Sequence, residues 1–327
     1  MAVDGLEKLS VVVCTHNPRR DFLAETLAAL RAQTLSTDQW ELAVIDNASD
    51  PPLAGRFDIG WHPRGRLIVE DQLGLTPARL RGIQETTGEL IVFVDDDNVL
   101  APDYLDQAME IAAEHPFIGA FSGNAEPRFE SPPAEWTKAY WKYLALRTVD
   151  RDQWSNLCPV SPTSPNGAGM CVRRSVAEAY AASVADDPLR RELDRRGNSL
   201  MSSGDTDLAV RACRCGLGAG VFAALTLTHL IPAARLTEDY LARIIEGTIY
   251  STILVHAVNG SPPAPIEHRP WRAALGRAKR RLLWGRRQRR LFEAELRGIH
   301  KGVEVWTRYA SRSTDVATSS SSGACTR

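Results

Sequence analysis

Short apolar runs alternate with helical patterns through the first third of this chain, and this alternation restricts the possible folds. Strands are expected at residues 9–14, 42–45, 67–69 and 90–94, and helices at residues 21–33 and 77–86. Because nearly continuous apolar strands are typical of sheets buried on both faces, we expect a mainly parallel α/β sheet covered by helices. In such sheets, ligands bind beyond the carboxyl ends of the strands.

The remainder of the chain has less regular patterns. We expect a helix at residues 134–146, a helix that starts near Gly204 and a β-type run at residues 220–230. Beyond residue 236 the pattern becomes helical, and Lys and Arg accompany an apolar stripe between residues 271 and 306. The expected division is a main domain at 1–262, a basic amphipathic helical extension at 263–310 and a Ser/Thr-rich disordered tail at 311–327.

Composition narrows the class of protein. A hydrophobic content of 44% and a net charge of -1 are typical of a globular chain, and the near-neutral charge argues against nucleic-acid binding. The six cysteines include no C-x-x-C pair, so neither a zinc site nor a disulfide framework is indicated. The first residues lack a signal-peptide pattern, and the longest apolar stretch, residues 244–258, is too short to span a bilayer. We therefore expect a cytoplasmic protein without a transmembrane helix.

Three consecutive carboxylates, Asp95, Asp96 and Asp97, stop the apolar strand at residues 90–94. Crowded carboxylates repel one another unless a cation is present, and oxygen ligands select Mg²⁺ or Mn²⁺, which also binds phosphate oxygens. A solvated acidic turn is the ordinary alternative. The position directly after a buried strand favours the metal interpretation.

Two further features are less specific. Asp205 and Asp207 stand at an expected helix start, where they either cap the helix or include a general base. His229, at the end of the run at 220–230, either ligates a metal or fills a core position. Neither feature decides a function alone.

The order of these pieces resembles the inverting family 2 glycosyltransferases, which have the GT-A nucleotide-diphospho-sugar transferase fold. The resemblance covers roughly residues 9–242. It rests on the segments VVVCTHNPRR, ELAVIDNAS, GLTPARLRGIQETTGELIVFVDDDN, NGAGMCVRR, SGDTDLAVRA and THLIPAARLT, which occur in the family's order.

The resemblance implies roles for eight residues. A nucleotide-diphosphate sugar would contact Thr15, Asp46, Arg79, Asp95 and Asp96, while Asp95, Asp97 and His229 would hold Mn²⁺ or Mg²⁺, and Asp205 would be the catalytic base. Asp207 is expected on the helix surface or in its cap. Two positions depart from the family pattern: Gly204 stands where Glu is usual, and Leu80 where Asn is common.

The resemblance thus implies transfer of a sugar to the hydroxyl of a glycan, lipid-linked or small-molecule acceptor, with cell-surface polysaccharide or glycolipid synthesis as the expected setting. A nucleotidyltransferase would normally carry a Gly-rich loop after its first strand, where this chain has Thr15-His16-Asn17-Pro18. A phosphohydrolase would have its carboxylates on the first strand. A catalytically inactive GT-A scaffold or interaction protein is the remaining alternative.

The basic segment at residues 270–310 has two interpretations. Either it lies on anionic lipid as a peripheral contact at the inner face of the membrane, with Trp271 and Trp284 at the interface, or it packs on the main domain or a dimer partner.

Overall fold

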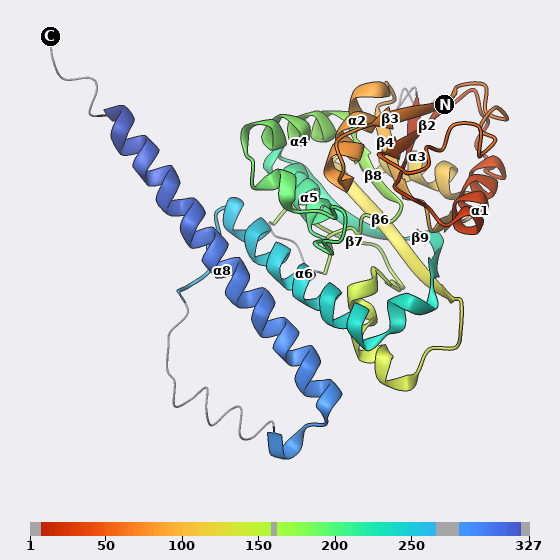
Figure 1. Ribbon diagram of the computed structural model, residues 1–327. Helices are drawn as coiled ribbons and strands as arrows, with labels where there is room; N and C mark the ends of the chain where they lie inside the picture. The colour runs from red at the N-terminus through yellow and green to blue at the C-terminus, as the bar shows by residue number, and fades with distance from the viewer. Residues whose placement is uncertain (1–7, 158–161, 266–280, 322–327) are drawn as a thin grey trace, which may run out of the picture.

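The computed structural model describes residues 8–157, 162–265 and 281–321, with side chains described up to residue 311. It is an α/β fold built on one mixed sheet with the order β3-β2-β1-β4-β8-β6-β9-β5, with β7 paired to β9 (Figure 1). The strands are β1 (Leu9–Thr15), β2 (Trp40–Asn47), β3 (Gly65–Glu70), β4 (Leu90–Asp95), β5 (Asn98–Leu100), β6 (Ile118–Phe129), β7 (Gln153–Ser155), β8 (Met170–Arg173) and β9 (Gly218–Ile231).

The helices are α1 (Arg20–Arg31), α2 (Leu75–Glu85), α3 (Tyr104–Glu114), α4 (Arg174–Asp186), α5 (Gly204–Arg214), α6 (Glu238–Val258) and α8 (Arg286–Ser321). Short 3₁₀ helices are η1 (Glu135–Leu144), η2 (Arg190–Glu192) and η3 (Ala233–Leu236). Each strand and helix expected in the first third of the chain is present, with bounds that differ by at most two residues.

The first half of the sheet is parallel, as expected. Strand β1 pairs in parallel with β2 and β4, and β2 pairs in parallel with β3, whereas β8 runs antiparallel to β4 and β6. Because parallel strands end at the same edge, Thr15 of β1 and Asp95 of β4 come to one edge of the sheet.

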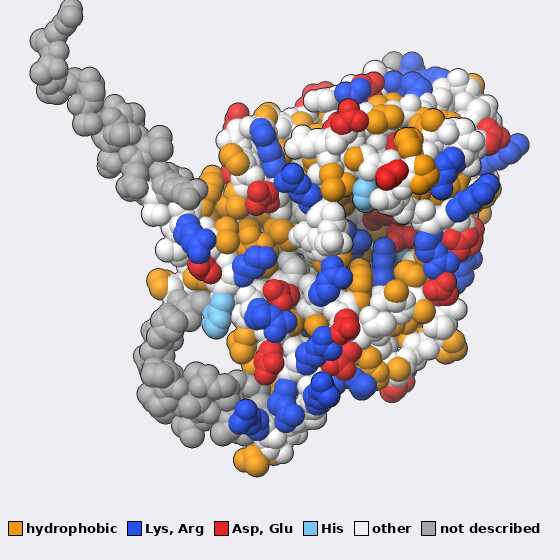
Figure 2. Space-filling view, in the orientation of Figure 1, with side chains coloured by type: hydrophobic (Ala, Val, Ile, Leu, Met, Phe, Trp, Pro, Cys, Tyr) orange, Lys and Arg blue, Asp and Glu red, His pale blue; other side chains and the backbone are white. Residues whose placement is uncertain are grey.

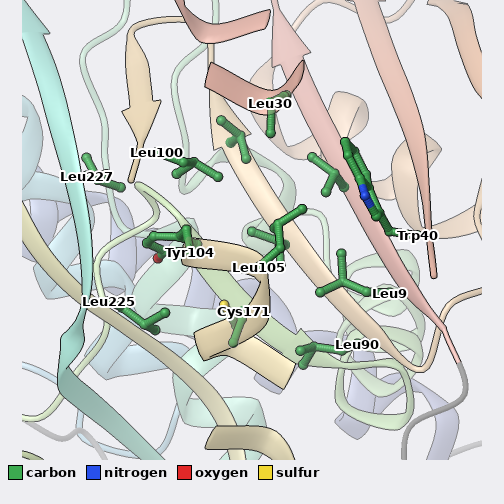
Figure 3. Close-up of a cluster of buried hydrophobic side chains, with 14 of the residues drawn as sticks. Leu9, Leu30, Trp40, Leu90, Leu100, Tyr104, Leu105, Cys171, Leu225 and Leu227 are labelled. Carbon is green, nitrogen blue, oxygen red and sulfur yellow. The ribbon is translucent and has the colours of Figure 1, made fainter. Parts of the chain in front are cut away.

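Helices cover both faces of this sheet. Val11 and Val13 of β1 pack with α1 and α3 in one core cluster, which Figure 3 shows around Leu105 and Tyr104. Val12, between them in sequence, packs with α2, α4 and α5 in the cluster on the other face. Successive strand residues point to opposite faces, so the continuous apolar run reflects a strand buried on both sides.

Helices α6 and α8 lie side by side (Figure 1). Leu291 and Ala294 of α8 are buried with Leu241, Ile244 and Ile245 of α6. The basic segment therefore packs on the main fold within the described residues, as one of its two interpretations predicts. Trp271 lies outside them.

Helix α6 is longer than the apolar stretch recognised in the sequence. Its 21 residues make it long and apolar enough for a membrane span by length and composition, with a mean hydropathy of 1.2 over its most apolar window. Half of that window is buried inside the protein, and Leu254 and Val255 belong to a core cluster. This burial is the environment of a core helix.

Two local predictions need correction. The helix expected at 134–146 is the 3₁₀ helix η1, in which Thr137 Oγ1 donates to the carbonyl of Ala134, and the chain leaves it at Ala145 with φ 55°. The composition of 311–327 predicts a disordered tail, whereas α8 continues to Ser321. Extending an existing helix adds one hydrogen bond for each residue ordered, without a new nucleation cost. Residues 322–327 lie outside the described part.

Candidate active site

A cavity of about 260 Å³ opens at the carboxyl ends of β1 and β4. Seven of the eight site residues expected from the sequence line it: Thr15, Arg79, Asp95, Asp96, Asp97, Asp205 and His229. These residues come from β1, α2, the end of β4 and the turn after it, α5 and β9. The fold therefore gathers at one edge side chains that are separated by up to 214 positions (15 to 229) in the sequence.

Asp46 is the exception, since it is not among the cavity-lining residues. Its carboxylate accepts hydrogen bonds from the backbone N–H groups of Ser49 (3.3 Å) and Leu53 (2.8 Å). The neighbouring Asn47 lines the cavity instead. Both carboxylate oxygens of Asp46 thus hold the loop after β2, and its expected contact with the nucleotide sugar stays a prediction.

The three carboxylates at the end of β4 are crowded together, with Asp97 buried and Asp95 and Asp96 half-buried. Burial raises the pKa of Asp96 to about 7, and the neighbouring carboxylates of Asp97 and Asp95 add to this effect, while a 2.5 Å hydrogen bond from Thr15 Oγ1 opposes it. Burial also raises the pKa of Asp95, against the attraction of the Arg79 guanidinium. A bound cation would relieve this repulsion, which is the electrostatic environment expected of a metal and diphosphate site.

Asp97 has a different environment from its two neighbours. Its Oδ2 lies 2.8 Å from Arg235 Nη2, and its Oδ1 lies 3.4 Å from His229 Nε2. Burial opposes ionisation of Asp97, but Arg235 and His229 outweigh it and lower the pKa of this carboxyl. Asp97 is therefore the carboxylate that stays ionised as the pH falls.

The residues present fit a divalent cation in their chemistry. Carboxylate oxygens and an imidazole nitrogen suit Mn²⁺, and the buried His229 Nδ1 has no hydrogen-bond partner in the described structure. No three His, Cys, Asp or Glu residues in the described ranges already form a metal-binding group. Arg235 occupies one oxygen of Asp97, so the donor atoms are present without being assembled into a ligand set.

Asp205 stands in the first turn of α5, with its side chain on the cavity. Its Oδ2 accepts a hydrogen bond from the backbone N–H of Gly167 (2.8 Å), and its Oδ1 accepts one from that of Thr206 (2.7 Å). Asp207, expected on the helix surface or in its cap, is instead buried and forms an ion pair with Arg190. Only one of the two carboxylates of this motif therefore reaches the cavity.

Sequence reasoning missed several lining residues, above all Asp194, Arg195 and Arg235. Asp194 Oδ2 lies 2.8 Å from Arg79 Nη1 in a buried ion pair, and burial raises the pKa of Asp194 to about 6 although Arg79 opposes this. These residues stand in loops or a short 3₁₀ turn, outside any apolar pattern. Arg235 belongs to the quoted segment THLIPAARLT, six positions after His229. Its closeness to His229 in the sequence was the signal that could have identified it as a site residue.

Comparisons with known proteins relate this chain to glycosyltransferases. Residues 10–167 match the family model described as Glycosyl transferase family 2. The Putative glycosyltransferase EpsH of Bacillus subtilis is 28% identical over 59% of this chain and 54% of its own length. The Glucosyl-dolichyl phosphate glucuronosyltransferase of Haloferax volcanii is 26% identical over 41% of this chain and 44% of its own.

The chain spans at most about half the length of these two relatives. The Uncharacterized protein y4gI of Sinorhizobium fredii is 31% identical over 33% of this chain, and the match covers only 12% of y4gI. Among solved structures, a mannosyltransferase, PcManGT from Pyrobaculum calidifontis in complex with GDP-Man and Mn²⁺, superposes with a TM-score of 0.52. That match covers 91% of this chain and 87% of the other at 18% identity. It shows that the two proteins share the GT-A fold.

Proposed function

Because residues 10–167 match the model of glycosyltransferase family 2, we propose that the protein is an inverting glycosyltransferase that moves a sugar from a nucleoside diphosphate to a hydroxyl acceptor. The proposal is supported by one cavity that is lined by Asp95, Asp97 and His229 and also by Asp205 from α5. Both halves of a transfer reaction, leaving-group stabilisation and proton removal, have side chains there.

The donor diphosphate would bind at the carboxyl ends of β1 and β4. Asp95, Asp97 and His229 would hold Mn²⁺ or Mg²⁺, and the bound ion would stabilise the charge that develops on the departing diphosphate. Thr15 and Asn47 would contact the nucleoside. The buried Arg79 would reach a phosphate oxygen with the guanidinium N–H groups that Asp194 does not bind. The neighbour that contains GDP-Man and Mn²⁺ supports a nucleotide-sugar donor and a divalent cation.

On the acceptor side, Asp205 would remove the proton from the attacking hydroxyl. The acceptor oxygen forms its bond to the anomeric carbon while the bond from that carbon to the diphosphate oxygen breaks, so the nucleoside diphosphate leaves with the electron pair. Two backbone N–H groups orient the Asp205 carboxylate. Attack opposite to the leaving group inverts the anomeric centre.

The products distinguish this function from its rivals. Incubation with UDP-, GDP- and dTDP-sugars, Mn²⁺ and candidate acceptors is expected to release a nucleoside diphosphate, measured by anion-exchange chromatography. A nucleotidyltransferase given a sugar phosphate and a nucleoside triphosphate would release pyrophosphate. Binding of a nucleotide sugar without any transfer or hydrolysis would favour the scaffold alternative.

For the acceptor we propose a glycan or a lipid-linked glycan, reached at the cytoplasmic face of a membrane. The end of the segment before α8 exposes Leu282 (86%) and Leu283 (68%) beside the exposed Arg286. Figure 2 shows Lys and Arg side chains gathered over the N-terminal half of α8. Apolar side chains among arginines suit the surface of an anionic bilayer.

Vesicle co-sedimentation tests this contact. With phosphatidylserine vesicles, Leu282→Ser combined with Leu283→Ser should reduce the bound fraction, whereas Leu157→Ser, which changes an equally exposed leucine (74%) elsewhere, should not. Equal sedimentation of all three proteins would exclude a contact through this surface.

A further inference from the structure

The space in front of Gly204, the first residue of α5, is filled by the carboxylate of Asp194. A Cβ atom at position 204 would lie 2.0 Å from Asp194 Oδ2, so no side chain fits there while Asp194 keeps its position. The backbone N–H of Ser203 donates to the carbonyl of Leu193 (3.0 Å), which holds residue 194 against the start of the helix. The glycine that departs from the family pattern is therefore required for space.

Asp194 in turn holds Arg79. The two side chains are 5% and 4% exposed, and Nη1 of Arg79 lies 2.8 Å from Oδ2 of Asp194. On its other side the guanidinium meets Gly167, where a Cβ atom would lie 2.6 Å from Nη2. Arg79 is thus enclosed between a carboxylate and a glycine, and both neighbours stand beside Asp205.

Other carboxylates compete for Arg79. Asp95 and Asp205 also attract its guanidinium, and both line the same cavity. An arginine released from Asp194 would have two anionic neighbours within the site, one proposed to bind the cation and one proposed to be the base. An ion pair with either would neutralise a group that the transfer reaction uses.

We propose that Asp194 is a positioning residue, which supplies from the loop before α5 the carboxylate that directs Arg79 toward the donor diphosphate and keeps it from Asp95 and Asp205. This inference rests on the proposed function, since Arg79 is taken to contact the donor. If so, the reaction needs a carboxylate at this point in the structure. Either residue 194 or residue 204, which lie against each other, could carry it.

A second buried ion pair provides a matched control. Arg190 of η2, four residues before Asp194, pairs with Asp207 of the same helix α5, and both are buried, but neither lines the cavity. Asp207→Asn therefore removes a buried carboxylate charge that pairs with Arg190 and not with Arg79. It should lower the melting temperature and leave nucleotide affinity unchanged.

The test measures the affinity of UDP, GDP and dTDP with Mn²⁺ by calorimetry, together with the melting temperature of each variant. Asp194→Ala should raise the Kd of the preferred nucleotide at least about tenfold, because a charged partner of Arg79 is lost. The milder Asp194→Asn keeps the side-chain volume and should show the same direction. Gly204→Asp alone should be destabilised by the clash with Asp194.

The decisive variant combines Asp194→Ala with Gly204→Asp, which moves the carboxylate across the same space. It should recover the Kd to within about threefold of the original protein, a coupling expected only of residues that share one site. Unchanged affinity in both Asp194 variants, or no recovery in the combined variant, would overturn the inference. An original protein that binds none of the three nucleotides would contradict the proposed function, and this inference with it.

Discussion

The backbone N–H of Gly167 donates a hydrogen bond to Asp205 Oδ2, with an N···O distance of 2.8 Å. This bond joins the loop before β8 to the first turn of α5, although the two residues are 38 positions apart. The carboxylate proposed as the base is thereby oriented by a backbone N–H group of this loop.

Replacing this carboxylate should abolish turnover while leaving the donor site intact. Asp205→Asn keeps an oxygen that accepts from Gly167 but cannot take a proton, so kcat should fall by about 10²- to 10⁴-fold. Nucleotide Kd should change little. Asp186→Asn, at an exposed position outside the cavity, is the control, and nucleoside diphosphate release is the measurement. Near-normal turnover of Asp205→Asn would assign the base to another residue.

The contact between α6 and α8 depends on a glycine. A Cβ atom at Gly298 of α8 would lie 2.7 Å from the backbone carbonyl oxygen of Glu246 in α6, so Gly298→Ala should separate the helices. Alanine ordinarily stabilises a helix relative to glycine. Here the clash should dominate, and the free energy of unfolding should fall by about 1–3 kcal/mol in urea titrations.

Gly285 is the control position for that experiment, because no atom of the described residues lies within 4 Å of a Cβ atom placed there. Gly285→Ala should leave the free energy of unfolding close to that of the original protein. If Gly298→Ala were as stable as Gly285→Ala, the close packing of α8 on α6 would be contradicted.

The stability of the protein should decline in alkaline solution. Burial raises the pKa of Cys14 from 9.0 to about 12, although Arg79 opposes this. Between these two values the unfolded chain has lost a proton that the folded protein retains, so the free energy of unfolding falls as the pH rises. One such group contributes a slope of about 1.4 kcal/mol per pH unit.

Unfolding titrations between pH 9 and 12 measure this slope. Cys14→Ala should make it shallower, whereas Cys215→Ala, which removes an exposed thiol, should not. Burial also raises the pKa of Cys171. Because Cys171 is present in both variants, part of the slope should remain in each. Identical slopes for the two variants would show that Cys14 ionises readily in the folded protein.

The sequence predicted those parts of the site that follow local patterns. The strand ending in Asp95, Asp96 and Asp97 is a continuous apolar run that stops at charged residues, so both its burial and the position of the carboxylates were readable. The helix start at Gly204 was likewise evident from its acidic first turn. Together they located the cavity.

The contacts within the site could not be predicted from the sequence, because they join segments that are far apart in the chain. The pair between Arg79 and Asp194 spans 115 positions, and nothing around Asp194 distinguishes it from other loop acids. Asp46 ends a predicted strand at the right edge, yet its oxygens bond to the backbone of the next loop. Side-chain direction at a strand end depends on the loop that follows, which has no periodic pattern.

The proposed donor site should bind a nucleotide sugar only with a divalent cation, which calorimetry with UDP-, GDP- and dTDP-sugars in the presence and absence of Mn²⁺ measures. Asp97→Ala and Asp97→Asn are compared with the exposed control Asp186→Ala. We expect that one donor binds only with Mn²⁺, that both Asp97 variants lose this binding and that the control retains it. Absence of binding by every nucleotide sugar under both conditions, or equal binding by the Asp97 variants, would contradict it.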